Sequence, residues 1–199
     1  RTRQYIPLHL LYNLIEPVMI GNYLQNRDFT ALNKRCQLLY KSNLILLIPV
    51  LAWLGAAGVF IITTLPGGKY KGYLWLLMVV MLQLTVGSHV VLLQLILNSV
   101  GKSALLVKAG MIALISMALF LMIAMLVNVQ FLVVGPLVFS LICNAYIIHA
   151  LKNQGYPYKL SWQLFLGTSI SGVIAFLVGV VTAKQHLLLI NQPVVISVV

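Results

Sequence analysis

The chain of 199 residues is mostly apolar: 61% of its residues are hydrophobic, only 8% are charged, and its mean hydropathy is +1.02. A soluble domain carries about 25% charged residues because its surface must meet water, so this composition excludes a water-soluble globular fold. The 13 Lys and Arg residues far outnumber the acids Glu16 and Asp28. They stand singly or in small groups between long uncharged runs, as in membrane loops, so no nucleic-acid partner is expected.

Apolar runs long enough for transmembrane helices, about 20 residues each, follow one another along the chain. The first, near residues 5–24, contains Pro7 and Pro17, which predict a bend or an interruption. Five full spans are expected at 43–66, 73–100, 109–127, 131–151 and 160–183, and the start of a further one at 187–199.

The long run after Lys108 is divided at Asn128-Val129-Gln130, ahead of Gly135-Pro136. None of the apolar runs alternates as the strands of a membrane barrel do. The sequence therefore predicts an all-α membrane protein built as a transmembrane helix bundle. Because the chain opens at Arg1 rather than Met and closes in an apolar stretch, we expect it to be an internal part of a longer protein.

Residues 28–41, between the first two spans, have the pattern of an amphipathic helix. Phe29, Leu32, Cys36 and Leu39 fall on one helical face, and Asp28 is placed to cap the helix. This pattern predicts a cytoplasmic segment lying on the membrane surface with its basic face toward anionic headgroups. An ordinary cytoplasmic extension linking two spans is the equal alternative.

Loop charges predict the orientation of the bundle. Alternate loops hold most of the basic residues: Arg27, Lys34, Arg35, Lys41, Lys102, Lys108, Lys152 and Lys159. The loops of the opposite side hold Lys69, Lys71 and Lys184, with Arg1 and Arg3 at the start of the chain. The positive-inside rule places the richer side in the cytoplasm.

Three stretches carry a resemblance to a known family. The run Glu16-Pro17, Asn26-Arg27-Asp28, Lys34-Arg35, Asn43-Leu44 resembles a cytoplasmic loop of polysaccharide exporters, and Gln94–Lys102 is similar to a helix end of the same proteins. Residues 61–70 match a periplasmic turn loosely, with Pro66 and Gly67 in place of the usual pair. Together they resemble the C-terminal half of an oligosaccharide or O-antigen flippase of the multidrug/oligosaccharidyl-lipid/polysaccharide exporter superfamily.

The resemblance implies one lobe of a two-lobed transporter with a central cavity that opens alternately to each side. The implied activity is translocation of a lipid-linked oligosaccharide, carried on a polyprenyl diphosphate, across the bacterial cytoplasmic membrane. Such a protein is a transporter rather than an enzyme, with membrane lipid around it and no cofactor. Proton or sodium coupling would bias its two states.

Polar side chains inside membrane spans are costly, and each is a candidate for function. In the span 73–100, Gln83 and Gln94 fall about 20° apart around a helix and Asn98 continues the same stripe. This stripe could line a hydrated cavity and bind sugar hydroxyls. Thr85, Ser88 and His89 form a second stripe on the other side. The competing interpretation is that both stripes link neighbouring helices.

The remaining candidates are single residues. His89 is the only titratable group well inside a span and could couple transport to protons, although a hydrogen bond to a neighbouring helix is the more common role. Glu16, beside Pro17, could bind a coupling cation or cap a helix end. Asn13 and Asn144 are further cavity candidates, the latter on one face with Ser140 and Cys143.

Two other patterns predict which helix faces pack closely and which residues lie at the membrane–water interface. Small residues recur at four-residue spacing in Gly167/Ser171, Thr168/Gly172 and Ala52/Ala56, which predicts close helix contacts. A group of aromatic rings near the cytoplasmic boundary resembles an interfacial belt: His149, Tyr156, Tyr158 and Trp162.

Three alternatives stay open from sequence. A multidrug extruder of the same fold would usually place acids in its cavity, whereas amides predominate here. A lipid II flippase is a close relative of the favoured interpretation. A membrane glycan-assembly enzyme would need acids, metal ligands or a nucleophile with its base, for which two acids leave little room.

Overall fold

The computed structural model describes residues 7–64, 73–160 and 162–190, and these residues form helices without any strand. The elements are α1 (Pro7–Asn26), α2 (Phe29–Thr64), α3 (Leu74–Ser99), α4 (Ala104–Val127), the 3-10 helix η3 (Val129–Val134), α5 (Gly135–Asn153) and α6 (Trp162–Ile190). Five stretches are long and apolar enough to cross a membrane: Phe29–Gly58, Leu74–Ser99, Ala104–Val127, Val129–Asn153 and Leu166–Lys184. The predicted all-α membrane helix bundle is confirmed.

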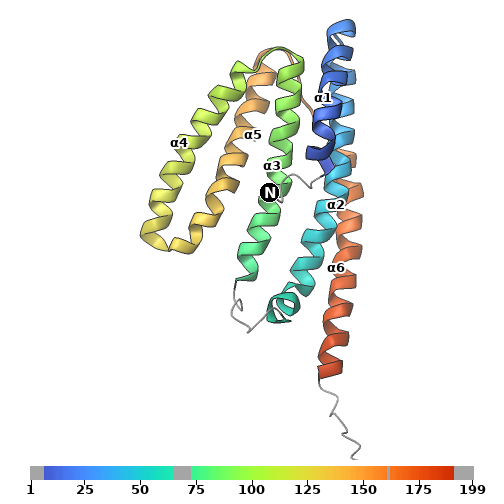
Figure 1. The fold of residues 1–199 in the computed structure, drawn as a ribbon, viewed down its shortest axis with the longest axis vertical. Helices are drawn as coiled ribbons and strands as arrows, with labels where there is room; N and C mark the ends of the chain where they lie inside the picture. The colour runs from blue at the N-terminus through green and yellow to red at the C-terminus, as the bar shows by residue number, and fades with distance from the viewer. Residues whose placement is uncertain (1–6, 65–72, 161, 191–199) are drawn as a thin grey trace, which may run out of the picture.

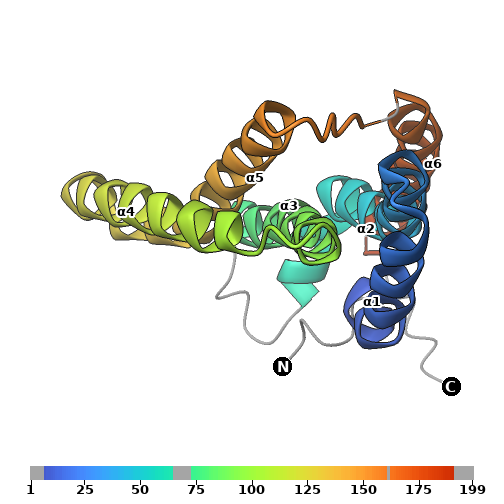
Figure 2. The ribbon, with the colours of Figure 1, turned by 90° about the horizontal axis from the view of Figure 1, so that it is seen from above.

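The helices form an open row rather than a closed bundle (Figures 1 and 2). Along the row, α4 packs on α5, α5 on α3, α3 on α2, and α2 on α6, while α1 lies against α2 and α3. α6 packs chiefly on α2 and runs parallel to it, since Gly172 faces Ile48 and Gly179 faces Ala56 farther along both helices. The row leaves long apolar faces of α4 and α6 uncovered by protein.

Three of the connections lie at the same end of the row, the upper end in Figure 1. They are the turns after α1 and after α3 and the linker that follows α5. Most of the basic residues counted on the richer side belong to these connections or to the helix turns beside them, among them Arg27, Lys102 and Lys159. The charge rule predicts that this end faces the cytoplasm.

Local sequence explains where the helices stop at that end. Gly101 has φ 69° and Gly155 has φ 82°, a left-handed conformation that glycine adopts readily. After α3, the Lys102 N–H donates to the Leu97 carbonyl at 2.8 Å and the Gly101 N–H to that of Asn98 at 3.2 Å. The same pair of bonds recurs after α5, from Tyr156 and Gly155. Both helices therefore end in a Schellman motif.

The predicted break after Lys108 and the predicted cap of α2 are both present. Asn128 is extended (φ −166°), and its side-chain oxygen accepts a hydrogen bond from the Gln130 N–H at 2.9 Å, which starts η3. The Asp28 carboxylate accepts hydrogen bonds from the N–H groups of Thr30 and Ala31, at 2.8 and 3.1 Å. Asp28 is thus the N-cap of α2.

The structure differs from the prediction around residues 28–41. No boundary separates that segment from the next span, because α2 is one continuous helix of 36 residues with Pro49 inside it. The apolar face exists, but protein covers it: Leu32, Cys36 and Tyr40 are buried in a core with Met19 and Tyr23 of α1. Packing against α1 and α3 keeps this segment in line with the rest of α2, so it does not lie on the membrane surface as a separate helix.

Other predicted bounds shift less. α1 is one helix that begins at Pro7 and holds Pro17 inside, without the predicted interruption. α6 extends to Ile190, so residues 187–190 continue it rather than start a new span; residues 191–199 lie outside the described residues.

Candidate functional site

Polar side chains that connect α3 to other segments form three separate groups. We call them the His89 network (Tyr40, His89, Asn144 and Tyr158), the Gln83 groove (Gln83, Val90, Met117, Pro136, Phe139 and Ser140) and the Glu16–Asn98 pair. Each joins α3 to different neighbours. α3 can reach all of them because it stands in the middle of the row, as Figure 2 shows.

The His89 network joins α2, α3, α5 and the linker after α5. The His89 Nδ1 lies 3.0 Å from the Asn144 Oδ1, and its Nε2 lies 2.8 Å from the Tyr158 hydroxyl oxygen. The Tyr40 ring packs on the imidazole with a centroid distance of 4.8 Å. All these side chains are buried. The network thus consists of buried contacts that join these segments to one another.

The hydrogen-bond pattern fixes how the protons are arranged. The Asn144 amide nitrogen donates to the Val86 carbonyl at 3.1 Å, so its oxygen is the atom that faces His89. An amide oxygen only accepts, hence His89 carries its proton on Nδ1 and its Nε2 accepts from the Tyr158 hydroxyl. Every donor finds an acceptor with a neutral imidazole. In this arrangement His89 links helices, the role weighed against proton coupling from sequence.

The linker after α5 is held down on α2 by several contacts. The Lys159 carbonyl accepts hydrogen bonds from the side-chain amides of Gln37 and Asn33, the latter at 3.4 Å. The Tyr156 ring packs on Phe29 at 5.2 Å. Burial raises the pKa of the Tyr158 phenol above its ordinary range, and the nearby Tyr40 and Cys36 add to the rise. Tyr158 is therefore a buried proton donor, which corrects its assignment to an interfacial belt.

The Gln83 groove opens between α3, α4 and α5 and has a volume of about 300 Å³. The Gln83 amide nitrogen donates to the Ser140 hydroxyl at 3.0 Å. Its amide oxygen is buried and has no hydrogen-bond partner. A buried acceptor without a partner is costly, so this oxygen is a weak point in the packing between α3 and α5.

The Glu16–Asn98 pair joins α1 to α3. The Asn98 amide nitrogen donates to the Glu16 carboxylate at 2.8 Å, and both side chains are half-buried. Gln83 and Asn98 are about 22 Å apart along α3 at 1.5 Å per residue, so the stripe predicted from sequence contributes to two different sites. Gln94 lies between them, half-buried. The side chain of Asn13 lies outside the described residues.

One buried polar residue was not singled out from sequence. The Asn43 side chain is 0% exposed, and neither its amide nitrogen nor its oxygen has a hydrogen-bond partner. It falls on the same face of α2 as Cys36 and Tyr40, and these spacings of four and three residues were the signal that could have revealed it. The other stripe residues, Thr85 and Ser88, bond to carbonyls of their own helix.

The side chains of the three groups offer amides, hydroxyl groups, one imidazole and the Glu16 carboxylate. No three His, Cys, Asp or Glu side chains come together in the described ranges in a way that could hold a metal ion. The chain matches no protein-family model, no curated protein and no solved structure.

Proposed function

We propose that this chain forms one lobe of a flippase that moves a lipid-linked oligosaccharide across the bacterial cytoplasmic membrane by alternating access. The observation that carries the proposal is the Gln83 groove. It places the Gln83 amide and the Ser140 hydroxyl group in the lining of a space of about 300 Å³ among membrane-spanning helices. These are the groups that sugar hydroxyls can bind.

The absence of charged side chains from the groove lining suits the hydroxyl-rich sugar part of this cargo. Its lining residues Gln83 and Ser140 are uncharged, and the others are apolar. A site for organic cations would be expected to offer a carboxylate, and Glu16 is instead bonded to Asn98 on the α1 side of α3. Glu16 is the residue we propose for proton or sodium coupling, because a carboxylate within a helix bundle can change its charge or bind a cation.

The open row of helices supports the proposal that this chain is one part of a larger alternating-access protein. α3 is packed on several sides, whereas α4 and α6 present apolar faces to lipid or to further helices. Alternating access needs two arrangements of similar free energy whose balance the cargo or an ion can shift. Helices that pack in a row can rearrange against a second lobe without breaking a closed core.

The test uses the full-length protein in a strain that lacks it, with surface glycan as the measurement. We expect Gln83→Leu and Ser140→Ala each to lower glycan output by about fivefold or more, the value of a lost hydrogen bond of about 1 kcal/mol. Ser116→Ala is the matched control, because Ser116 bonds only to the Ile112 carbonyl of its own helix on α4. Unchanged output at normal protein levels would remove the Gln83 groove from the transport path.

Reconstituted vesicles separate the cargo classes. A fluorescent lipid-linked oligosaccharide, lipid II and an organic cation are offered to the same protein, and movement of each is followed. Transport of the oligosaccharide alone supports the proposal. Movement of the cation or of lipid II would instead favour an extruder or a peptidoglycan-precursor flippase, and bond formation on the glycan would indicate an enzyme.

A further inference from the structure

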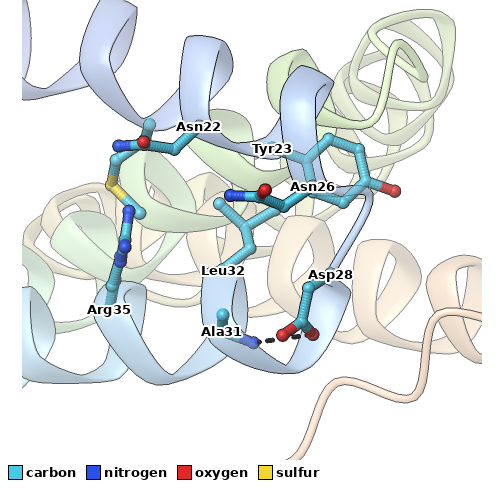
Figure 3. A pocket seen from close by; sticks show the side chains of 8 residues that line it. Asn22, Tyr23, Asn26, Asp28, Ala31, Leu32 and Arg35 are labelled. Carbon is cyan, nitrogen blue, oxygen red and sulfur yellow. Dashed lines mark hydrogen bonds between the residues drawn. The ribbon is translucent and has the colours of Figure 1, made fainter.

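The predicted cytoplasmic end of the molecule contains two hollows between α1 and α2 that share residues. The first, drawn in Figure 3, has a volume of about 30 Å³. Its lining mixes polar and apolar residues: Met19, Asn22, Tyr23, Asn26, Asp28, Ala31, Leu32 and Arg35. This is room for about one or two water molecules, enough to hold a small polar group at its mouth.

The second hollow is a shallow apolar groove of about 430 Å³ on the same pair of helices. Its lining residues are Ile15, Val18, Met19, Arg35, Leu38, Leu39 and Ser42. Met19 and Arg35 line both hollows, so the polar pocket continues into the apolar groove beside Arg35. In the groove wall, Val18 is 61% exposed and Leu38 is 59% exposed. These side chains need an apolar neighbour.

The charges near the pocket are arranged for an anion. Arg35 extends from α2 toward Asn22 of α1, while Asp28 lies at the far end of the pocket (Figure 3). The Asp28 carboxylate is directed to the start of α2, where it accepts hydrogen bonds from the Thr30 and Ala31 N–H groups. The exposed Arg35 guanidinium is therefore the charge that faces the junction of pocket and groove.

The depth of the junction fits lipid headgroups. α2, with 36 residues, is about 54 Å long at 1.5 Å per residue, longer than the hydrocarbon core of about 30 Å. Lys34, Arg35 and Lys41 place the start of α2 in the headgroup region, because charged groups avoid hydrocarbon. An arginine at this depth binds phosphate well, through paired N–H donors.

We propose that the junction binds one anionic phospholipid, with its phosphate on Arg35 beside the Asn22 amide and an acyl chain in the groove along Val18, Leu38 and Leu39. The site holds α1 against α2 at the cytoplasmic end. It is separate from the Gln83 groove and holds whether or not the protein is a flippase, because it needs only a membrane around these helices.

Native mass spectrometry of the full-length protein in detergent tests the headgroup part. The probes are phosphatidylglycerol and phosphatidylcholine with identical acyl chains. The wild type should retain phosphatidylglycerol preferentially, and Arg35→Gln should lower that retention by about fivefold, the value of an exposed ion pair at the upper end of its usual range. Arg35→Lys should keep part of it. Lys34→Gln is the matched control, an exposed neighbouring charge that lines neither hollow.

A second pair of variants tests the acyl-chain part. Val18→Trp fills the groove and should also reduce phosphatidylglycerol retention, whereas Val80→Trp, on an exposed position of α3, should not. Soluble glycerol phosphate should fail to compete, since it lacks the chain. Equal retention of the two lipids, equal loss in Arg35→Gln and Lys34→Gln, no effect of Val18→Trp, or competition by glycerol phosphate would each overturn the proposal. Size-exclusion profiles establish that each variant is folded.

Discussion

α3 and α4 are neighbours along the chain with similar lengths, yet their surroundings are opposite. In the apolar 18-residue window of each helix, α4 has the higher mean hydropathy, 2.6 against 2.2, but only 11% of that window is buried inside the protein, against 39% for α3. In α4 the buried positions are Leu105 and the small residues Ala109, Ala113 and Ala124, while long apolar side chains point outward. In α3 the buried set includes Thr85, Ser88 and His89.

The difference shows how a membrane changes the meaning of hydropathy. The exposed face of α4 meets lipid or further helices, so it must be apolar, and alanines on the other face let it approach α5. Protein surrounds α3, so its polar groups can find partners there, and the most informative side chains concentrate on the helix with the lower hydropathy. Polar residues in spans therefore indicate the protein-facing side, and the following predictions test that rule.

The largest expected effect comes from removing the centre of the His89 network. His89→Leu leaves the Asn144 oxygen and the Tyr158 hydroxyl buried without their partner. We expect the free energy of unfolding to fall by about 2–4 kcal/mol, since each orphaned group costs about 1–3 kcal/mol. Ser116→Ala on α4 should change it by less than about 0.5 kcal/mol. Thermal unfolding in detergent measures both; equal shifts would break the contrast between the two helices.

A second contrast lies within α6. A Cβ atom at Gly179 would stand 2.7 Å from the Ala56 Cβ and 3.2 Å from the Trp53 carbonyl oxygen, whereas nothing lies within 4 Å of one at Gly167. Gly179→Ala should push α6 away from α2 and lower the free energy of unfolding by about 1–3 kcal/mol. Gly167→Ala should be neutral or stabilising by up to about 1 kcal/mol, from helix propensity.

The same unfolding measurement decides this pair. A loss of stability in Gly167→Ala as large as in Gly179→Ala would mean that α6 has a second packed face. α6 also corrects the prediction from small-residue spacing. Thr168 and Gly172 are buried at the α2 interface, but Gly167 is exposed on the other side of α6.

Replacing each of two buried asparagines by leucine should change the free energy of unfolding in opposite directions. Asn144 bonds to both His89 and Val86, whereas Asn43 has no partner for either polar atom. Asn144→Leu should lower the free energy of unfolding by about 2 kcal/mol, while Asn43→Leu should raise it by about 1 kcal/mol, because a buried amide without partners is replaced by a buried apolar side chain that needs none. Destabilisation by Asn43→Leu would show that this amide has a partner, such as a buried water molecule.

The sequence was sufficient for features that depend on nearby residues. The all-α class, the break at Asn128, the cap at Asp28 and the end of α3 at Gly101 each follow from apolar length or from the conformational preference of one residue. These features are local, so the rest of the fold does not alter them. Orientation by charge also counts only the residues flanking each span, and it stays a prediction.

The features that the sequence missed depend on how distant segments meet. Nothing near Tyr158 indicates that the linker folds back onto α2 and brings its hydroxyl to His89, 69 residues earlier in the chain. Gly167 and Gly172 have equivalent local patterns, and only the position of α2 distinguishes them. The segment 28–41 has a true amphipathic face, but whether lipid or α1 covers that face is a tertiary property.

The prediction with the smallest expected effect concerns Tyr158, at the buried end of the His89 network, and the pH dependence of the free energy of unfolding. Burial raises the pKa of Tyr158 above that of an unfolded tyrosine, about 10. Its neutral form thus stabilises the fold fully below pH 10, and this contribution declines as the pH rises above 10, because the unfolded chain then ionises first. Tyr158→Phe has no such group, so the stability gap between wild type and variant should narrow by about 1.4 kcal/mol per pH unit above 10. Lysine titration is common to both proteins and cancels in the difference. A gap that stays constant between pH 8 and pH 11 would mean that water reaches the Tyr158 hydroxyl and that the linker leaves α2 more readily than the contacts of Lys159 indicate.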